Sequence, residues 1–211
     1  MKFDIHVHSK YSSDGVMEPN FILKLAKKNN YDGIVITDHN SMEAYGHLDR
    51  NGLTIIKGEE VSSCCGHILA IDIEEFIPKG LSIEETIEKI KEQGGIAIAA
   101  HPYRFWSGLG EKNTSRNKFD AIEILNSRSF KKDNDKAKRL SYELKLPGTA
   151  GSDAHLEHEF GRAWVIVNND LHKEIIKGEA KVGGYSRNFN DTIKYVTRSV
   201  SLWIERGFKK I

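Results

Sequence analysis

The feature that most constrains the fold is an alternation between short apolar runs and longer amphipathic stretches along residues 1–155. The apolar runs are "FDIHV", "GIVITDH", "LTIIKGEE", "HILAIDI", "IAIAAH", "FDAIEILN" and "LPGTAGSDAH". Most of them are separated by stretches with helical spacing, which cover residues 18–29, 41–49, 82–93 and 133–144. Strands that alternate with helices predict βαβ units around a largely parallel sheet.

The length of this region narrows the architecture further. A standard eight-stranded α/β barrel takes ~250 residues, and the runs here occupy far fewer. We therefore expect a smaller, irregular barrel or an open sheet. Ser82 followed by Glu85 predicts a capped helix start, and Gly94-Gly95 predicts the end of that helix. The polar stretch 108–118 is typical of a surface loop.

Composition limits the class of protein. A chain of 211 residues is long enough for one domain with a sizeable core or for two small domains. Its 39% hydrophobic and 29% charged residues are typical of a globular protein and argue against disorder. The 31 basic residues balance 30 acidic ones, so composition gives no reason to expect a polyanion binder, although a local basic rim stays open.

The cysteine content and the apolar runs indicate where the protein is located, and the last residues carry a helical pattern. The adjacent Cys64 and Cys65 leave no second pair for a disulfide framework, and neither a leader nor an apolar run of ~18 residues stands out. We therefore expect a soluble cytoplasmic protein with no membrane contact and no obligatory protein partner. Residues 183–211 end in an apolar stripe that predicts a packing helix, with an oligomer face as the alternative.

Acids and histidines gather where the apolar runs begin or end. In a parallel α/β fold the carboxyl ends of the strands meet at one rim, so residues far apart in the sequence would converge there. The candidate metal ligands at these positions are His6, His8, Asp14, His39, Glu60, His67, His101, Asp153 and His155.

Other interpretations of single residues stay open. Asp38 or Asp153 could cap the next helix, His67 could be a core histidine, and His101 could simply end a strand. One shared site explains all of these residues at once, because each lies near the same end of its strand. The separate explanations would all have to hold together, which makes them the poorer account. His47, His158 and His172 fit helix or loop positions outside it.

The donor set indicates a particular kind of chemistry. Imidazole and carboxylate suit zinc, manganese or iron, and the absence of thiolate argues against a structural zinc site. A catalytic zinc takes about three protein ligands, so this set predicts two or three divalent transition-metal ions, with Glu60 placed to bridge them. Clustered ions generate hydroxide at neutral pH and clamp the oxygens of a phosphoryl group, which makes phosphate-ester hydrolysis the default reaction.

The motifs "HVHSKYSSDG", "ITDHNS", "GEEVSS", "GHILA", "AHP" and "GSDAH" occur in one order over residues 1–165. In this the chain resembles the PHP family, named for polymerase and histidinol phosphatase. The resemblance implies a single PHP domain, a distorted (β/α)7 barrel, with a trinuclear metal site at the carboxyl ends of its strands.

The resemblance also implies how the ligands are shared. One ion would take His6, His8, Glu60 and Asp153. A second would share Glu60 and add His67 and His101, and a third would take Asp14, His39 and His155. The family pattern of glycine, any residue and glutamate selects Glu60 over Glu59, and strand alternation turns Glu59 the other way.

Groups around the metals are predicted separately. Arg104 follows the "AHP" run, Arg128 lies in "EILNSRS", where similar proteins carry an Asn and an Arg, and Arg162 lies beyond the last motif. A guanidinium fork suits a pair of phosphate oxygens, although each arginine could equally be solvated or ion-paired. Asp38 is expected to orient a metal-bound imidazole, or else to cap a helix. An Asp or His near the rim would protonate the leaving oxygen.

The sequence thus predicts a phosphomonoesterase that acts on a small metabolite or nucleotide through a metal-bridging hydroxide. The nearest alternative is a 5′-end nuclease or nucleoside bisphosphate phosphatase of the same fold, because PHP relatives also act on such substrates. Aromatic residues beside the site, Tyr103, Phe105 and Trp106, could stack a base or could cover the barrel mouth. An amidohydrolase, or a non-enzymatic barrel associated with RNA, ranks lower.

Overall fold

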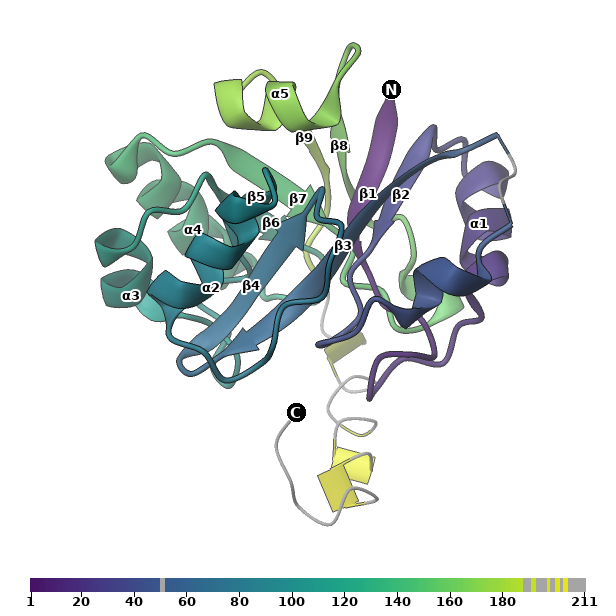
Figure 1. The fold of residues 1–211 in the computed structure, drawn as a ribbon, viewed down its shortest axis with the longest axis horizontal. Helices are drawn as coiled ribbons and strands as arrows, with labels where there is room; N and C mark the ends of the chain where they lie inside the picture. The colour runs from purple at the N-terminus through teal and green to yellow at the C-terminus, as the bar shows by residue number, and fades with distance from the viewer. Residues whose placement is uncertain (50–51, 188–190, 193–196, 198–199, 202, 205–211) are drawn as a thin grey trace.

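The computed structural model describes residues 1–49, 52–187, 191–192, 197, 200–201 and 203–204, and Figure 1 shows its elements in chain order. The strands are β1 (Lys2–Val7), β2 (Gly33–Ile36), β3 (Thr54–Ser63), β4 (Gly66–Ile71), β5 (Ile96–Ala99), β6 (Ala121–Asn126), β7 (Gly148–Gly151), β8 (Ala163–Ile166) and β9 (Lys181–Gly184). The helices are α1 (Pro19–Lys28), α2 (Ile83–Glu92), α3 (Gly110–Arg116), α4 (Lys131–Leu144) and α5 (Leu171–Lys177), with 3-10 turns η1 (Glu43–His47) and η2 (Glu157–Glu159).

The strands form one sheet that curls into a nearly closed barrel. Their order is β7-β6-β5-β4-β3-β2-β1-β8-β9. Beyond β7 the chain returns to β1, where Asp153 N donates to His6 O at 2.7 Å and His8 N donates to Ala154 O at 2.8 Å. Gly151 permits this approach, because a Cβ there would lie 2.2 Å from His6 Cβ. The predicted α/β barrel is confirmed.

The directions of the strands differ from the largely parallel sheet that the sequence predicts. Neighbours are parallel from β1 to β3 and from β5 to β7. Strand β4 runs antiparallel to both β3 and β5, while β8 and β9 add an antiparallel extension beside β1. The described part of the chain thus has nine strands in a mixed sheet, because the seven predicted runs form β1 to β7 and β8 and β9 are additional. Strand β4 is antiparallel because a tight turn joins it to β3 and leaves no room for a crossover helix.

The barrel interior is filled by apolar side chains and is not a pore. The interior cluster brings Phe3 and Ile5 of β1 together with Leu69 of β4 and Ile98 of β5. Helix α5 lies across the end where β1 begins (Figure 1), and its Ile175 joins the same cluster. This packing closes one end of the barrel and leaves the other end, where β1 to β3 finish, for polar residues.

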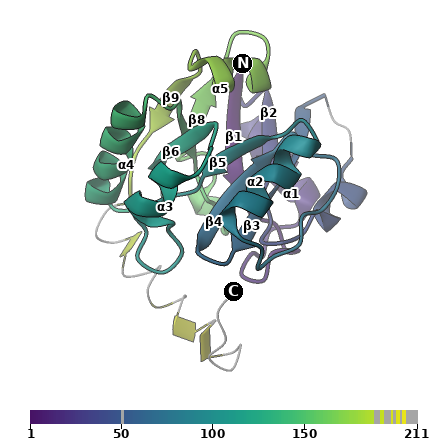
Figure 2. The ribbon, with the colours of Figure 1, turned by 60° about the vertical axis from the view of Figure 1, so that its left-hand side comes forward.

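Helices cover the outside of the barrel, with α1 on the right and α2, α3 and α4 on the left in Figure 1, and Figure 2 shows α2, α3 and α4 from another side. Helix α1 packs Ile22 and Leu23 against one half, and α2 packs Ile87 and Ile90 against the other. The predicted start of α2 is confirmed, because Ser82 and Glu85 form a reciprocal capping box. Burial of one apolar face thus stabilises each helix and offsets the conformational entropy that its backbone loses on ordering.

Two predicted segments differ from the structure or lie partly outside the described residues. Residues 108–118 are not a loop throughout, because α3 forms within them and buries Thr114. The predicted C-terminal segment 183–211 begins inside β9, and much of it, including positions 193 and 196 of the apolar stripe, lies outside the described residues. Of the stripe, Val200, Trp203 and Ile204 are exposed. The single-domain assignment stays a prediction.

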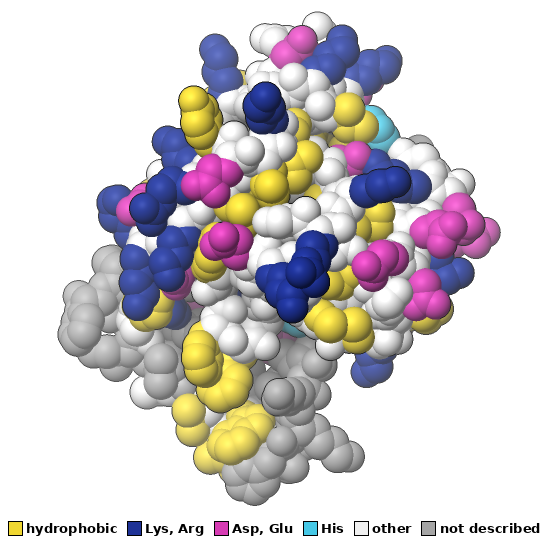
Figure 3. Space-filling model, turned by 90° about the vertical axis from the view of Figure 1, so that its left-hand side faces the viewer, with side chains coloured by type: hydrophobic (Ala, Val, Ile, Leu, Met, Phe, Trp, Pro, Cys, Tyr) yellow, Lys and Arg dark blue, Asp and Glu magenta, His cyan; other side chains and the backbone are white. Residues whose placement is uncertain are grey.

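Surface charge agrees with the balanced composition. On the face that carries α3 and α4, basic and acidic side chains are interspersed and form no continuous basic tract (Figure 3). No helix among the described residues has the length and apolarity needed to cross a membrane.

Candidate metal centre

The predicted ligands converge at the barrel end opposite α5. Residues His6 and His8 come from the end of β1, His39 follows β2, and Glu60 lies in β3. His67 lies near the start of β4, and it reaches the same rim because β4 runs antiparallel to β3. His101, Asp153 and His155 follow β5 and β7, and Asp14 lies in the segment after β1.

Glu60 occupies the middle of the cluster. Its Oε1 lies 2.8 Å from one imidazole nitrogen of each of two histidines, and its Oε2 lies 3.1–3.3 Å from three more. The first two histidines are His67 and His101, and the other three are His6, His8 and His39. A carboxylate whose two oxygens face separate groups of imidazoles has the geometry of a ligand shared between ions.

Asp153 and Asp14 complete the cluster. Asp153 Oδ1 lies 3.4 Å from His8 Nε2 and 3.5 Å from His155 Nδ1. The other ring nitrogen of His155, Nε2, lies 2.9 Å from Asp14 Oδ2. Asp153 adopts a left-handed conformation with φ 54°, and His101 has φ 25°; both backbones are sparsely populated for these residues, which is common at functional sites.

Four overlapping groups bring their donor atoms within 4.8 Å of one another. They agree with the family-implied sets in part: His6, His8 and Glu60 stay together, as do Asp14, His39 and His155. The remaining pairing differs, because His67 groups with His39 and Glu60, while His101 groups with His6 and Asp153. The four groups are His8–Asp14–His39–His155, His6–His8–Glu60, His6–His101–Asp153 and His39–Glu60–His67.

The residues present fit metal ions. His8 Nε2 and His39 Nδ1 lie 3.2 and 3.3 Å from Glu60 Oε2, yet both nitrogens are buried and make no hydrogen bond within the described part of the chain. Buried polar nitrogens normally have a partner, and leaving one without costs about 1–3 kcal/mol. Imidazole and carboxylate donors together suit divalent transition metals, so bound cations would account for these nitrogens.

The charges favour the same occupants. Burial would raise the pKa of Glu60, but His39, His67 and His6 hold it well below its usual range. Burial would also raise the pKa of Asp153, and Arg104 and His6 hold it well below the ordinary value. Both carboxylates are therefore anionic at neutral pH, as metal binding requires.

The histidines divide into two groups. Burial lowers the pKa of His39 well below its ordinary value and lowers that of His101 to about 4, so both rings are neutral donors. Burial also tends to lower the pKa of His8, but Asp153 and Glu60 raise it to about 9. His8 thus takes a proton where a metal cation would otherwise balance the carboxylates, and metal binding would displace it.

Glu123 is a buried residue of the site that the sequence analysis did not identify. Its Oε1 lies 2.9 Å from His6 Nδ1, and its Oε2 accepts from His101 N at 2.8 Å and from Asn126 Nδ2 at 3.1 Å. A carboxylate on the outer nitrogen of a histidine fixes the tautomer and leaves Nε2 for a metal. The signal available in the sequence was an acid inside the otherwise apolar run "AIEIL".

Two of the three predicted arginines reach the cluster. Arg104 Nη2 lies 2.5 Å from Asp153 Oδ2 and donates to Asn126 Oδ1 at 2.7 Å. Arg128 Nη1 lies 3.3 Å from Asp153 Oδ1 and 2.5 Å from His155 Nδ1. Two guanidinium groups therefore meet beside one candidate ligand, where an anionic substrate group could replace part of their contact with Asp153.

Arg162 makes other contacts. Its Nε donates to His158 O at 3.0 Å, and its Nη1 lies 2.9 Å from Asp191 Oδ2. Neither partner belongs to the histidine–carboxylate cluster. The assignment of Arg162 as a phosphate-binding residue stays a prediction without a supporting contact.

Asp38 acts on the backbone more than on a ring. Its Oδ1 and Oδ2 accept from Ser9 N and Ser9 Oγ at 2.5 and 2.6 Å, which fixes the chain just after His8. The outer ring nitrogens of His8 and His155 instead lie 3.1 Å from Ser12 Oγ and 2.9 Å from the Asp153 carbonyl oxygen. Asp38 thus supports the position of His8 indirectly.

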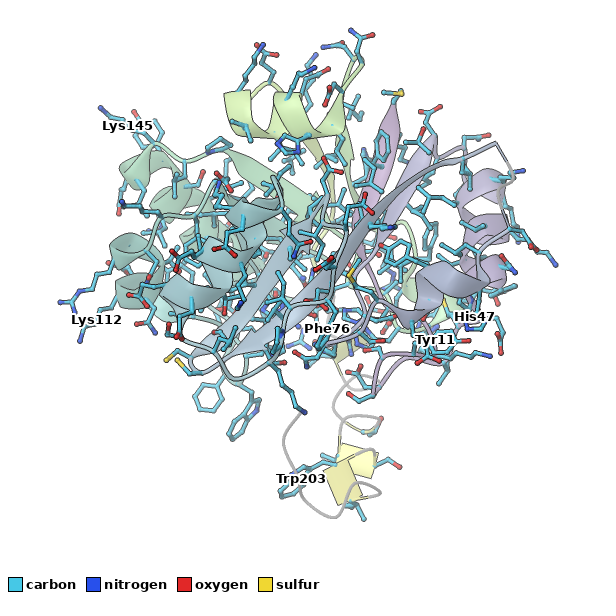
Figure 4. The ribbon with its side chains drawn as sticks, in the orientation of Figure 1. Tyr11, His47, Phe76, Lys112, Lys145 and Trp203 are labelled. Atoms are coloured by element: carbon cyan, nitrogen blue, oxygen red, sulfur yellow. The ribbon has the colours of Figure 1, made fainter. Side chains whose placement is uncertain are left out.

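The histidines that were placed outside the site have other neighbours. His47 stacks on Tyr11 with ring centroids 5.1 Å apart, and the two are labelled side by side in Figure 4. His172 Nδ1 lies 2.8 Å from Asp72 Oδ2. Neither residue occurs in the groups that could hold a metal ion.

Comparisons with known proteins agree with this site. The family model for the PHP domain matches residues 4–144, and the model described as PHP-associated matches residues 131–178. An uncharacterised protein of Methanocaldococcus jannaschii is 42% identical over 142 residues, which cover 60% of this chain and 82% of that protein.

Two solved structures share the fold. One is a two-domain protein from Bacteroides vulgatus described as containing a PHP-like metal-dependent phosphoesterase, with TM-score 0.66 and 19% identity, covering 88% of this chain and 65% of that one. The other is a lesion-specific endonuclease from Pyrococcus furiosus, with TM-score 0.66 and 21% identity, covering 86% of this chain and 57% of that one. This chain thus spans about two thirds or less of these two proteins. With the family model matched over most of its length and the ligand motifs gathered at one rim, the chain belongs to the PHP family.

Proposed function

We propose that the protein is a metal-dependent phosphoesterase that hydrolyses a phosphomonoester of a small metabolite or nucleotide. Family membership and the cluster of histidines and carboxylates support a metal-dependent hydrolase. The observation that carries the finer proposal is the meeting of Arg104 and Arg128 on Asp153, beside the Glu60-centred cluster. Guanidinium groups suit the paired oxygens of a phosphate, and two of them beside the cluster could bind one there.

The cluster would hold two or three divalent ions of manganese, zinc or iron. Glu60 would be shared, with His6, His8 and Asp153 on one side of it and His67 and His101 on the other; Asp14, His39 and His155 would form the outer set. Bound ions would supply Lewis acidity toward a phosphoryl oxygen and lower the pKa of water.

The protein's own side chains prepare this site. Glu123 fixes the ring of His6 and, through the amide of His101, the position of a second ring. Asn126 Nδ2 donates to Asp153 Oδ2 at 3.0 Å while its Oδ1 holds Arg104. The arginines would neutralise the bound phosphate, and the attachment of Arg104 to Asn126 limits the side-chain freedom that substrate binding must remove.

A second candidate is a 5′-end nuclease or nucleoside bisphosphate phosphatase of the same fold. Phe105 and Trp106 follow Arg104 directly and are 85% and 82% exposed, with ring centroids 4.8 Å apart. Tyr103, in contrast, packs against the core. Two exposed rings next to a phosphate-directed arginine favour a substrate with a stackable base.

Other functions have less support. An amidohydrolase would use ligands in a different pattern along the strands, and a non-enzymatic RNA-associated barrel would be expected to lose ligands that this chain keeps. The cytoplasmic location and the independence from a protein partner remain predictions.

The test is a phosphatase screen of sugar phosphates, nucleotides and short oligonucleotides, with manganese, zinc and iron supplied in turn to the metal-free protein. Glu60→Gln serves as the inactive variant and Glu59→Gln as its matched control. Phosphate release that needs metal and Glu60 supports the proposal. Release that persists in Glu60→Gln, or none from any substrate with metals bound, contradicts it.

A further inference from the structure

The tip of the β3–β4 hairpin carries the two cysteines of the chain next to each other. Ser63 pairs with Gly66 across the turn, so Cys64 and Cys65 form the tip, and both are exposed. Successive residues of a strand point to opposite faces. Here the turn brings both side chains together, and the two Sγ atoms lie 2.8 Å apart.

The turn is held by its surroundings. Cys64 N donates to Leu81 O at 2.8 Å, and Cys65 N donates to Ser63 Oγ at 3.3 Å. Gly66 has φ +139° and lies so close to Leu109 that a Cβ would come within 2.8 Å of Leu109 N. These contacts fix the backbone of the tip, so the two thiols are presented together without further ordering.

This pair lies beside the candidate metal centre but has different chemistry. The β3 arm of the hairpin carries Glu60, and the β4 arm carries His67, whose N donates to Ser107 O at 3.0 Å. The nitrogen and oxygen donors of that centre suit borderline and hard cations. Two exposed sulfurs suit soft ones, so they form a separate class of donor on the same hairpin.

We propose that Cys64 and Cys65 form a binding site for a thiophilic ligand of the trivalent arsenical class, which bonds to both sulfurs at once. With an aryl arsenoxide, both S–H bonds and the arsenic–oxygen bond break and two arsenic–sulfur bonds form. The two protons leave with the oxygen as water, and no atom changes its oxidation state.

Phenylarsine oxide added to the reduced full-length protein tests the site. Intact mass should rise by one arsenical less one water per chain, and the adduct should survive an excess of a monothiol and be removed by a dithiol. Cys64→Ser and Cys65→Ser should each lose the adduct to the monothiol. Both positions are exposed, so neither variant should disturb the fold.

Adjacent cysteines stay adjacent in the unfolded chain, so the unfolded chain could also bind the arsenical. Thermal unfolding therefore tests whether the folded chain binds it more tightly than the unfolded chain does. Tm should rise in the parent protein by about 3–6 °C for every tenfold tighter binding to the folded chain. Both serine variants should show no rise. An adduct that a monothiol removes, an equally stable adduct on either variant, or an unchanged or lowered Tm would overturn the proposal.

Discussion

The two ends of the barrel differ in what holds them together. At the end where β1 begins, α5 places Leu171 and Ile175 in the apolar cluster of the interior, and the packing closes it. At the other end, Glu60, Asp153 and four of the histidines, His6, His8, His101 and His155, are equally buried but are charged or polar. The first end is stable without any ligand, whereas the second concentrates charges that need a cation to balance them.

Stability and function therefore reside at different ends of the barrel. A barrel with apolar closure at one end can carry a destabilising polar cluster at the other. Substitutions at the α5 end should therefore change the free energy of unfolding, and substitutions of the candidate metal ligands should change metal content and turnover.

The largest effect is expected for Glu60→Gln, which removes the charge shared by both groups of imidazoles. Metal-dependent turnover should fall by on the order of a thousandfold, about 4 kcal/mol of transition-state stabilisation. Steady-state kinetics with the best substrate measures this. Glu59→Gln, on the opposite face of the same strand, should retain turnover, and equal losses in the two variants would show that the shared-ligand assignment is wrong.

Arg104→Ala should weaken substrate handling without removing metal. Losing a charge-assisted contact with phosphate costs roughly 2–4 kcal/mol, on the order of thirty- to a thousandfold in kcat/KM. Arg128→Ala should follow the same direction with a smaller loss. Metal content and Tm should stay nearly unchanged, and Arg162→Ala serves as control because its contacts lie elsewhere. If Arg104→Ala and Arg128→Ala both keep the parental kinetics, the phosphate is bound by groups other than these two arginines.

Ile175→Ala tests the apolar end. Truncating this fully buried side chain should lower the free energy of unfolding by about 2–4 kcal/mol, because it leaves a cavity between α5 and the strands. Denaturant unfolding measures the loss. Metal stoichiometry of the folded variant should equal that of the parent, and a loss of metal would show that the two ends are coupled.

Glu59→Gln should change how stability depends on pH. Burial raises the pKa of Glu59 from 4.5 to about 8, although Ile77 N donates to it. Between these values the unfolded chain loses a proton that the folded chain keeps, so this group lowers stability as pH rises, by at most about 1.4 kcal/mol per pH unit.

Glutamine does not titrate, so the stability advantage of Glu59→Gln over the parent should grow across that window and level off above about pH 8. Unfolding by urea at several pH values measures it. An advantage that is constant with pH would mean that Glu59 is ionised in the folded chain.

Much of the rim could be predicted because strand periodicity is local. The run "FDIHV" places His6 and His8 at a strand end without knowledge of any partner, and Ser82 with Glu85 marks a helix start on its own. The rule that strand ends meet at one rim then brings distant residues together.

What the sequence did not reveal depends on tertiary contacts. The antiparallel direction of β4 follows from the tight turn at Cys64 and Cys65, whose residues carry no strong turn signal. Helix α3 lacks an apolar period and is stabilised by local polar contacts such as Thr114 Oγ1 donating to Gly110 O at 2.9 Å. Glu123 resembles an ordinary exposed strand residue until β1 and β6 are placed in one barrel.

Metal stoichiometry tests the central claim most directly. Protein purified without chelator, or reconstituted and then desalted, should carry two or three transition-metal ions per chain by elemental analysis, with Glu59→Gln equal to the parent and Glu60→Gln depleted. Chelation should remove the ions together with turnover, and re-addition should restore both. A parent protein that retains no metal after reconstitution, or a Glu60→Gln variant with full metal content, would contradict the account.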